Sequence, residues 1–465
     1  MNNRNIIEYL HKLGVPPQNT EYRAMIDLWE SWYRGKVDSF HAYNVFNGIT
    51  TTKKQRATLS MAKTVAEDWA NLLLNERVQI AVDGEADQEY LDSLLTYNRF
   101  AVDGNRAIEW AFALGTAAFS EYLDENGVPR IDCHKATQVW PIRWESGRIT
   151  ECAFASVGTD GERETVFVRM YRRNERGLYV IENHLLEAET GHELDLPPWV
   201  EPGVETGSEA PLFQILSPNI ANNIDTTSPM GVSVYANAVD ALKAVDAVYD
   251  SYVNEFLLGR KRLMVPMSMI QVELSRDGKS VPLFDPQDAV YTAFQPADGQ
   301  KADFHDFSPD IRSDAHMNGL RAALNTLSFK CGLGTGRYEF DRQGGVRTAT
   351  EVVSEQSDLY QTLCKHEIVL RDALTGLVRA LLFLAGRGTD AEVTITFDDS
   401  VIQDKSTIRK EARDDVQAGL MSKYRYLTEI AGLGEDDANE ELARIRAESS
   451  ITAEAIDFFS VNSAE

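Results

Sequence analysis

The 465-residue chain has few of the residues that build most catalytic and metal sites. Its four cysteines, Cys133, Cys152, Cys331 and Cys364, form no CxxC pair, and its eight histidines are scattered. We therefore expect reduced thiols that pack in the interior, rather than a disulfide framework or a zinc site. The segment GHELDL at Gly191 is not the HExxH motif of zinc peptidases. The sequence predicts no metal and no cofactor.

Nucleotide-binding and membrane-spanning patterns are also missing. No GxxxxGK[ST] loop occurs, and the nearest segment, at 278–280, has Glu273 where the first glycine should stand. The most apolar window, 374–385, is interrupted by Arg379 and is too short to span a bilayer. The first residues, MNNRNIIEYLHKLG, lack the apolar core of a signal peptide. We expect a soluble protein that is assembled in a reducing cytoplasm.

Charge is the most uneven feature of the composition. The chain has 46 Lys and Arg residues against 72 Asp and Glu residues, which gives a formal net charge of −26. Non-specific affinity for DNA comes from basic side chains that displace counterions from phosphates, so the sequence disfavours a protein that grips DNA. A wall along which DNA slides should repel phosphates or stay neutral, which an acidic chain can do. Solubility also explains an acidic balance, and charge alone slightly favours that simpler interpretation.

The N-terminal half changes from a helical to a strand pattern near residue 116. Helical patterns occur in the aromatic-rich first 45 residues and in residues 56–75, 87–97 and 103–114. From 116 to about 184, short β-branched and aromatic runs alternate with glycine-containing turns, which predicts a β-meander. Residues 197–211 contain four prolines and two glycines, which is typical of a loop.

Residues 228–385 have an unusual order of elements: a helix, a basic cluster, a short β-rich insertion, a helix, a glycine-rich loop and one very long helix. The first two helices are predicted to begin at Ser228-Pro229 and Ser308-Pro309, because serine caps a helix and proline suits its first position. The second should end near Cys331. A capping box at Thr348–Glu351 begins the long helix, which contains no proline.

Apolar residues on the long helix repeat every 11 positions, in alternating steps of seven and four, which is typical of a nearly straight helix. At the usual rise per residue this helix would span about 60 Å. His366 lies on this seam and is interpreted as a core histidine rather than a ligand. The seam consists of Val352, Leu359, Leu363, Leu370, Leu374 and Leu381.

Two segments, SPMGVSVYANAVDALKAVDAVYDSYVNEFLLGRKRLMV and RTATEVVSEQSDLYQT, resemble the portal, or head–tail connector, proteins of tailed double-stranded DNA bacteriophages of the siphophage type. The resemblance is specific from about Pro211 to Ala385 and looser on either side. Portals form a ring, usually dodecameric, at one capsid vertex, and DNA enters and leaves the capsid through it. The resemblance therefore implies a structural virion protein that assembles into a homo-oligomeric ring.

The resemblance also implies an α+β portal fold with an α/β wing, a two-helix stem, a small β-containing clip, a long radial helix and a helical crown. The expected partners are DNA in the channel, the terminase large subunit and later the head-completion or adaptor proteins at the clip, and the scaffold and major capsid protein; no membrane is expected. The expected parts are the wing at 1–228, stem helix one at 229–262, the clip at 263–307, stem helix two at 308–332, the tunnel loop at 333–347, the long wing helix at 348–386 and a C-terminal wing or crown at 387–465.

Two groups of residues are candidate site residues. The resemblance places the first group in the tunnel loop at the narrowest part of the channel, although an ordinary interhelical loop is the alternative. The second group is expected at the stem–clip junction and at subunit contacts. The first group is Arg337, Arg342, Gln343, Gly344, Gly345 and Arg347, and the second is Asp246, Asp250, Arg260, Lys261 and Arg262.

Each member of the second group has more than one interpretation. The basic cluster at 260–262 could contact DNA phosphates, pair with acids of a neighbouring subunit, or only interact favourably with the carboxyl end of a helix. Asp246 and Asp250 lie one turn apart and repel each other by a few tenths of a kcal/mol. They could present a DNA-repelling stripe, meet cations of an adjacent subunit, or lie on a solvated face.

Two other classes of function compete with the portal interpretation. A nuclease or terminase-type packaging enzyme would need a Walker motif or clustered acids with metal spacing, and the pair Asp398-Asp399 is interpreted as a turn after a strand. A monomeric DNA-binding head adaptor is disfavoured by the net charge. We therefore expect a portal subunit without catalytic residues, located in the virion at the portal vertex after assembly in the host cytoplasm.

Overall fold

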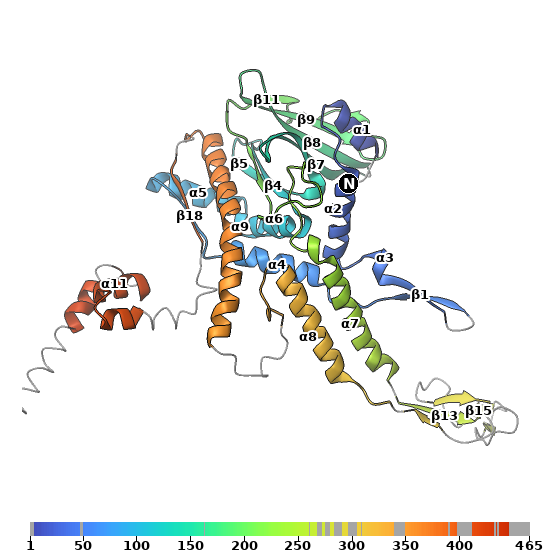
Figure 1. Ribbon diagram of the computed structural model, residues 1–465. Coiled ribbons are helices and arrows are strands. Elements are labelled where there is room, and N and C mark those ends of the chain that lie inside the picture. Colours follow the sequence, from blue (N-terminus) through green and yellow to red (C-terminus); the bar gives the residue numbers. More distant parts are fainter. Residues whose placement is uncertain are drawn as a thin grey trace, which may run out of the picture. The chain divides into compact units, whose positions relative to one another are not determined.

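The structure is a computed structural model in which the chain divides into two compact units, residues 1–397 and 398–465. The first unit combines helices with several sheets (Figure 1), so the α+β class expected from the sequence is confirmed. The structure describes residues 4–46, 50–161, 163–259, 261–266, 272–274, 280–282, 291–295, 305–307, 309–338, 349–388, 391–397, 412–431, 434 and 437–445.

The helices of the N-terminal part pack around buried aromatic rings. Trp29 and Trp69 are fully buried, and the ring of Trp69 stacks on that of Phe112 with centroids 5.5 Å apart. The three helices predicted between residues 56 and 114 are confirmed as α4, α5 and α6. The elements are α1 Arg4–Lys12, α2 Thr20–Tyr33, α3 Asp38–His41, β1 Ala42–Phe46, β2 Thr51–Gln55, α4 Met61–Leu73, β3 Gln79–Val82, α5 Glu85–Tyr97 and α6 Phe100–Leu114.

The predicted β-meander is confirmed as antiparallel strands in two sheets. One sheet has the order β12-β4-β5, and the other has the order β10-β9-β8-β7-β6 with β11 also paired to β9. Alternate residues of β8, such as Val166 and Val168, are buried, as the two-residue period of a strand requires. Helix α1 covers this face with Ile6 and Leu10. The strands are β4 Ala117–Leu123, β5 Pro129–Lys135, β6 Val139–Glu145, β7 Arg148–Asp160, β8 Arg163–Arg173, β9 Tyr179–Glu187, β10 Glu193–Leu194, β11 Gly203–Glu205 and β12 Phe213–Leu216.

The helix predicted to begin at Ser228-Pro229 begins only at Val239, so that prediction is wrong. The intervening residues form turns and a short 3₁₀ helix against the end of α6. The backbone N–H of Gly231 donates to Thr116 Oγ1 at 3.0 Å. A Cβ atom at Gly231 would lie only 2.4 Å from the carbonyl oxygen of Gly115, so the two backbones touch here. This tertiary contact overrides the local helix signal.

Three long helices follow in the first unit. Helices α7 and α8 pack against each other, and α9 runs beside β12, β4 and β18 (Figure 1). Helix α9 begins and ends close to the predicted positions, and α8 begins five residues later than predicted. Along the predicted seam of α9, Leu363, Leu370, Leu374 and Leu381 are buried and Leu359 is half-buried, and the side chain of Val352 lies outside the described part of the chain. The elements are α7 Val239–Leu258, α8 Ser313–Lys330, α9 Ala349–Leu384 and β18 Val393–Thr396, which pairs with β3.

The second unit is described only in short stretches. Helix α11 spans Lys423–Arg425 and leads directly into a π-helical turn, Tyr426–Ile430. Residues 437–445 are helical. The pair Asp398-Asp399 lies outside the described residues. Within the described part of the chain, no helix is long and apolar enough to cross a membrane.

Candidate functional site

The most distinctive feature of the first unit is an arm made of α7 and α8. The two helices lie side by side with opposite chain directions, and the arm leads to a group of short strands (Figure 1). Leu242 and Val245 of α7 and Leu320 and Leu324 of α8 are buried. These apolar stripes follow helical spacing, so burying them between the two helices and the body accounts for the pairing.

An ion pair links the two helices at the far end of the arm. Arg312 donates from Nε to Glu255 Oε1 at 3.0 Å and from Nη2 to Oε2 at 2.8 Å, and its backbone N–H also donates to Oε1. These hydrogen bonds lower the pKa of Glu255 to about 2. His316 Nε2 lies 3.4 Å from Glu255 Oε2. The fork of one guanidinium therefore fixes the end of α7 to the start of α8.

The strands beyond the arm form a small β module. In one sheet, β13 lies between β16, which is parallel to it, and β17, which is antiparallel; β14 and β15 form a hairpin. Lys261 Nζ lies 3.3 Å from Asp306 Oδ2, an exposed ion pair within the module. Arg262 is exposed on β13, and Arg260 lies outside the described residues. The strands are β13 Arg262–Pro266, β14 Val272–Leu274, β15 Ser280–Pro282, β16 Tyr291–Phe294 and β17 His305–Phe307.

The two described residues of the basic cluster differ in their surroundings, because Lys261 forms an ion pair within the chain and Arg262 is exposed. The partner of Lys261 is an acid of its own chain, which the sequence interpretations did not include. The exposed pair contributes little to stability, because water and salt screen it. The exposed Arg262 side chain stays available for a partner outside the chain, and Arg260 stays a prediction.

The two aspartates of α7 bind the loop that precedes α4, and for Asp246 this corrects the sequence interpretation, whereas the interpretations of Asp250 stay predictions. Asp246 is 3% exposed, so it lies neither on a solvated face nor in a DNA-repelling stripe nor at a subunit contact. Its Oδ1 accepts from the backbone N–H of Leu59 at 2.8 Å, and its Oδ2 accepts from Thr58 Oγ1 and His41 Nε2, both at 3.0 Å. The carboxylate therefore acts as a buried anchor between α7 and the N-terminal segment.

The tautomer of His41 follows from its second hydrogen bond. The backbone N–H of Val37 donates to His41 Nδ1 at 2.9 Å, so Nδ1 is an acceptor and the proton lies on Nε2, facing Asp246. One turn along α7, Asp250 is half-buried and its Oδ1 accepts from the backbone N–H of Ala57 at 2.9 Å. Both aspartates therefore receive donors from the same short loop. No local pattern indicates this contact, because its partners are about 200 residues apart in the chain.

The start of the glycine-rich loop lies against α4. Gly332, Gly334 and Gly336 have positive φ angles of 77°, 74° and 79°, a region that glycine adopts readily. The Arg337 guanidinium contacts the carboxylate of Asp68, with Nη2 and Oδ1 3.4 Å apart. The other predicted tunnel-loop residues, Arg342, Gln343, Gly344, Gly345 and Arg347, lie outside the described residues.

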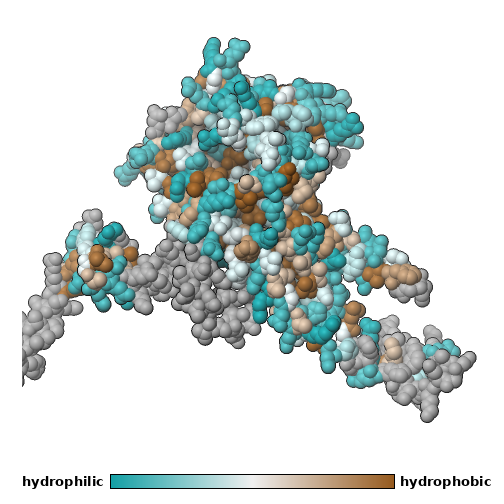
Figure 2. All heavy atoms as spheres, in the orientation of Figure 1, coloured by the Kyte–Doolittle hydropathy of each residue, from teal (hydrophilic) through white to brown (hydrophobic). Residues whose placement is uncertain are grey.

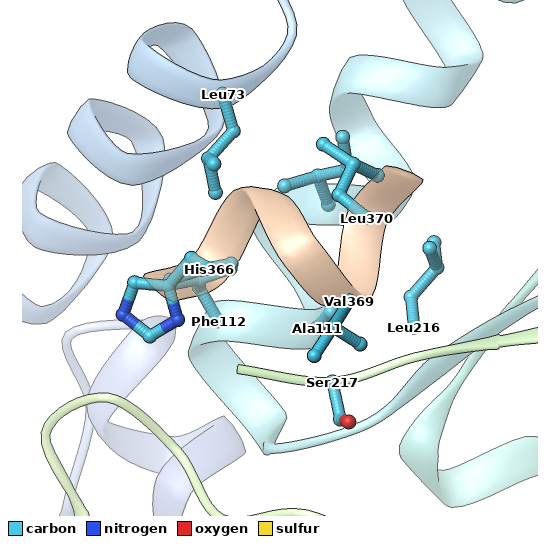
Figure 3. A pocket seen from close by; sticks show the side chains of 9 residues that line it. Leu73, Ala111, Phe112, Leu216, Ser217, His366, Val369 and Leu370 are labelled. Atoms are coloured by element: carbon cyan, nitrogen blue, oxygen red, sulfur yellow. The ribbon is translucent and has the colours of Figure 1, made fainter. Parts of the chain in front are cut away.

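A small apolar pocket lies where α9 crosses α4 and α6 (Figure 3). His366 is buried at its edge, and its Nδ1 accepts from the backbone N–H of Asn219 at 3.0 Å. Its ring meets those of Trp69 and Phe112 edge-on, with centroids 4.8 and 4.9 Å away. Burial lowers the pKa of His366 to about 4. The interpretation of His366 as a core histidine is confirmed. The pocket is lined by Leu73, Ile108, Ala111, Phe112, Leu216, Ser217, His366, Val369 and Leu370.

One buried polar pair has the composition of part of a catalytic site. Ser120 Oγ and His134 Nε2 are 2.8 Å apart, but both residues are buried in the sheet core. The His134 ring stacks on Phe154, and burial lowers its pKa to about 3. No substrate can reach such a pair, so we interpret it as structural. Within the described ranges, no group of three or more His, Cys, Asp or Glu residues could hold a metal ion.

Comparisons with known proteins identify the family of the chain. A family model described as phage portal protein, SPP1 Gp6-like, matches residues 15–455. No curated protein sequence gives a significant match. Among solved structures, a chain from the virion of a native gene transfer agent particle is 12% identical, with a TM-score of 0.44, and the match covers 93% of this chain and 99% of that one. Because the family model matches nearly the whole sequence, the chain belongs to the SPP1 Gp6-like family of phage portal proteins and is a structural protein of the virion with a portal function.

Proposed function

We propose that the chain assembles into a closed ring of about a dozen subunits at one capsid vertex, through which DNA is packaged and ejected. The observation that carries this proposal is the arm of α7 and α8, which leads from the body to a separate β module (Figure 1). Such an arm has no role in a compact monomer. In a ring, neighbouring arms would together enclose a channel and present the β modules at its end.

The parts of the ring are assigned as the resemblance to portal proteins implies. Residues 229–262 and 308–332 form the stem, 263–307 the clip, 1–228 the wing, 348–386 the long wing helix and 387–465 the C-terminal wing or crown. Residues 333–347 form the tunnel loop. Within the proposed stem, regular helix is limited to Val239–Leu258 and Ser313–Lys330.

The ring itself catalyses no reaction in this proposal. The terminase large subunit docks first on the clip and supplies the work of packaging, and head-completion or adaptor proteins replace it. Scaffold and major capsid protein hold the ring in the shell. The net charge of −26 supports passage of DNA rather than tight binding, because phosphates are repelled by an acidic wall.

Native mass spectrometry and negative-stain imaging of the purified protein test the assembly. We expect closed rings at micromolar concentration and poor binding of linear duplex DNA at low salt. Only monomers and dimers, across salt conditions, would contradict the ring. A submicromolar affinity for DNA at physiological salt, with a steep salt dependence, would indicate a DNA-gripping adaptor instead.

The tunnel loop is tested separately by replacing Gly344 and Gly345 with valine. β-Branched residues disfavour positive φ, so the loop should become stiffer. We expect rings to form normally, while procapsids that contain the variant package or retain less DNA. Normal packaging and retention in intact rings would mean that the loop is a passive connector.

A further inference from the structure

The hairpin of β1 and β2 projects from the first unit and pairs with no other strand among the described residues (Figure 1). All five residues of β2 are exposed, and Phe46 at the end of β1 is 68% exposed. Figure 2 shows apolar atoms on its surface. A two-stranded hairpin without a covering layer is only marginally stable in water, and its open edges favour pairing with another surface. These features indicate a partner outside the fold of one subunit.

The charge of this hairpin is opposite to that of the chain. Residues 39–66 contain no Asp or Glu, although the whole chain has a net charge of −26. Arg56 is used within the fold, because its guanidinium lies over the ring of Phe40, 4.2 Å from its centroid. Lys53 and Lys54 are exposed on β2, and neither forms an ion pair with any residue that the structure describes. Among the residues that the structure describes, the hairpin therefore offers two cations without an ion-pair partner, and Lys53 shares its face with Phe46.

Helix α5 has the complementary charge. Residues 78–98 contain no Lys, Arg or His. Glu85, Glu89 and Asp92 are spaced by one turn of helix, so they share one face of α5, and all three are exposed. In the described part of the chain none of them forms an ion pair. Carboxylates one turn apart destabilise a helix by a few tenths of a kcal/mol, which a cationic partner would reverse.

The two surfaces lie on opposite sides of the first unit (Figure 1), so they cannot meet within one subunit. A ring closes through heterologous contacts, in which one side of each subunit meets the other side of the next. We infer that the β1–β2 hairpin of one copy docks on α5 of the adjacent copy through the face that carries Lys53 and Phe46, with Lys53 facing the carboxylates and Lys54 adding positive charge from the other face. This inference rests on the ring proposed above.

Charge reversal in the full-length protein tests the contact. The variant K53E/K54E reverses the charge of the hairpin, and the variant E85K/E89K reverses the charge of the exposed face of α5. Exposed Arg163 and Arg176, in the β-meander, provide a charge-matched control, R163E/R176E. At about 0.15 M salt, where screening leaves close contacts intact, each reversed variant alone should need at least about tenfold more protein to form rings, a loss of about 1.4 kcal/mol. The control should assemble like the wild type.

Mixing the two reversed variants makes the test specific for a contact between copies. The negative hairpin of K53E/K54E then faces the positive α5 of E85K/E89K, and the unchanged positive hairpin of E85K/E89K faces the unchanged negative α5 of K53E/K54E. Because both contacts join opposite charges, mixed rings should form at wild-type concentrations. If wild-type rings form but the reversed variants assemble equally well, or mixing fails to restore rings, the hairpin contact is wrong and the ring proposal stands. Loss of rings in the control would assign the effect to net charge and also overturn the contact. A wild type that forms no rings would overturn both.

Normal rings of K53E/K54E with reduced retention of packaged DNA would show that the hairpin contacts DNA. That result would also contradict docking on α5. The readout is therefore both the ring fraction by native mass spectrometry and the length of packaged DNA in procapsids.

Discussion

Replacing Asp246 with alanine should destabilise the protein strongly, although this residue belongs to no catalytic site. The carboxylate receives hydrogen bonds from His41, Thr58 and the backbone of Leu59, at distances of 2.8 to 3.0 Å. The side chains of Asp246 and His41 are 4% and 1% exposed. The substitution would leave three donors buried without their acceptor and would remove the contact that fixes α7 to the loop before α4.

The magnitude follows from these contacts. Each buried donor that is left without its acceptor costs about 1–3 kcal/mol, and each hydrogen bond to a charged group contributes about 1.5–3 kcal/mol. The three bonds share one acceptor and therefore do not add. We expect the free energy of unfolding to fall by about 3–5 kcal/mol, a large part of the usual total of about 5–15 kcal/mol.

Asp250 provides the matched control, because it is one turn away on the same helix and only half-buried. Outside its own helix it accepts one described hydrogen bond, from the backbone of Ala57 at 2.9 Å. Asp250→Ala should therefore cost about 1 kcal/mol. Urea unfolding followed by circular dichroism measures both variants. Equal stability of the Asp246→Ala variant and the wild type would refute the buried anchor. If the Asp246→Ala variant were as stable as the wild type but altered DNA packaging, the interpretation of Asp246 as part of a DNA-repelling stripe would be right.

Three further changes test other parts of the fold. Burial raises the pKa of Glu121 well above its usual value, so the carboxyl group keeps its proton in the folded state, whereas it ionises above pH about 4.5 in the unfolded state. The free energy of unfolding of the wild type should therefore fall by up to about 1.4 kcal/mol per pH unit above that point. Glu121→Gln should unfold at a higher temperature than the wild type at pH 7 but not at pH 4. Gly231→Ala should cost about 1–3 kcal/mol through overpacking, whereas Gly203→Ala, with open space around it, should be nearly neutral in the same thermal scan. Arg312→Ala should speed amide exchange at the end of α7 with little change in melting temperature, because the Arg312 side chain of this ion pair is 72% exposed and water screens its charge; a large drop in melting temperature would contradict this.

The elements that could be predicted from the sequence are those fixed by local periodicity. The helices between residues 56 and 114, the meander and α9 each bury one regular stripe or face, so their apolar spacing is visible without the partner. The start of α7 was missed because the contact between Gly231 and Gly115 joins distant segments. A Ser-Pro pair signals a helix start only when nothing else binds the same backbone.

Charged residues were harder to interpret than apolar ones for a related reason. The role of Asp246 depends on His41, which is 205 positions away in the chain. A surface carboxylate and a buried anchor carboxylate look alike in a sequence, since both occur on amphipathic helices. The family resemblance supplied the function, which one acidic chain without a catalytic motif could not have indicated from its residues alone.

The Asp246 anchor also connects two surfaces to which different roles are assigned above. Strand β2 ends at Gln55, and the loop held by α7 begins two residues later, at Ala57. A shift of the arm would therefore pull directly on the base of the β1–β2 hairpin. We expect Asp246→Ala to raise amide exchange throughout β2, because the strand loses its fixed end, and Lys243→Ala on the exposed side of α7 to leave it unchanged. Hydrogen exchange followed by mass spectrometry measures both. Unchanged protection of β2 from amide exchange in the Asp246→Ala variant would mean that the hairpin and the arm move independently. A contact made by the hairpin would then have no effect on the position of α7.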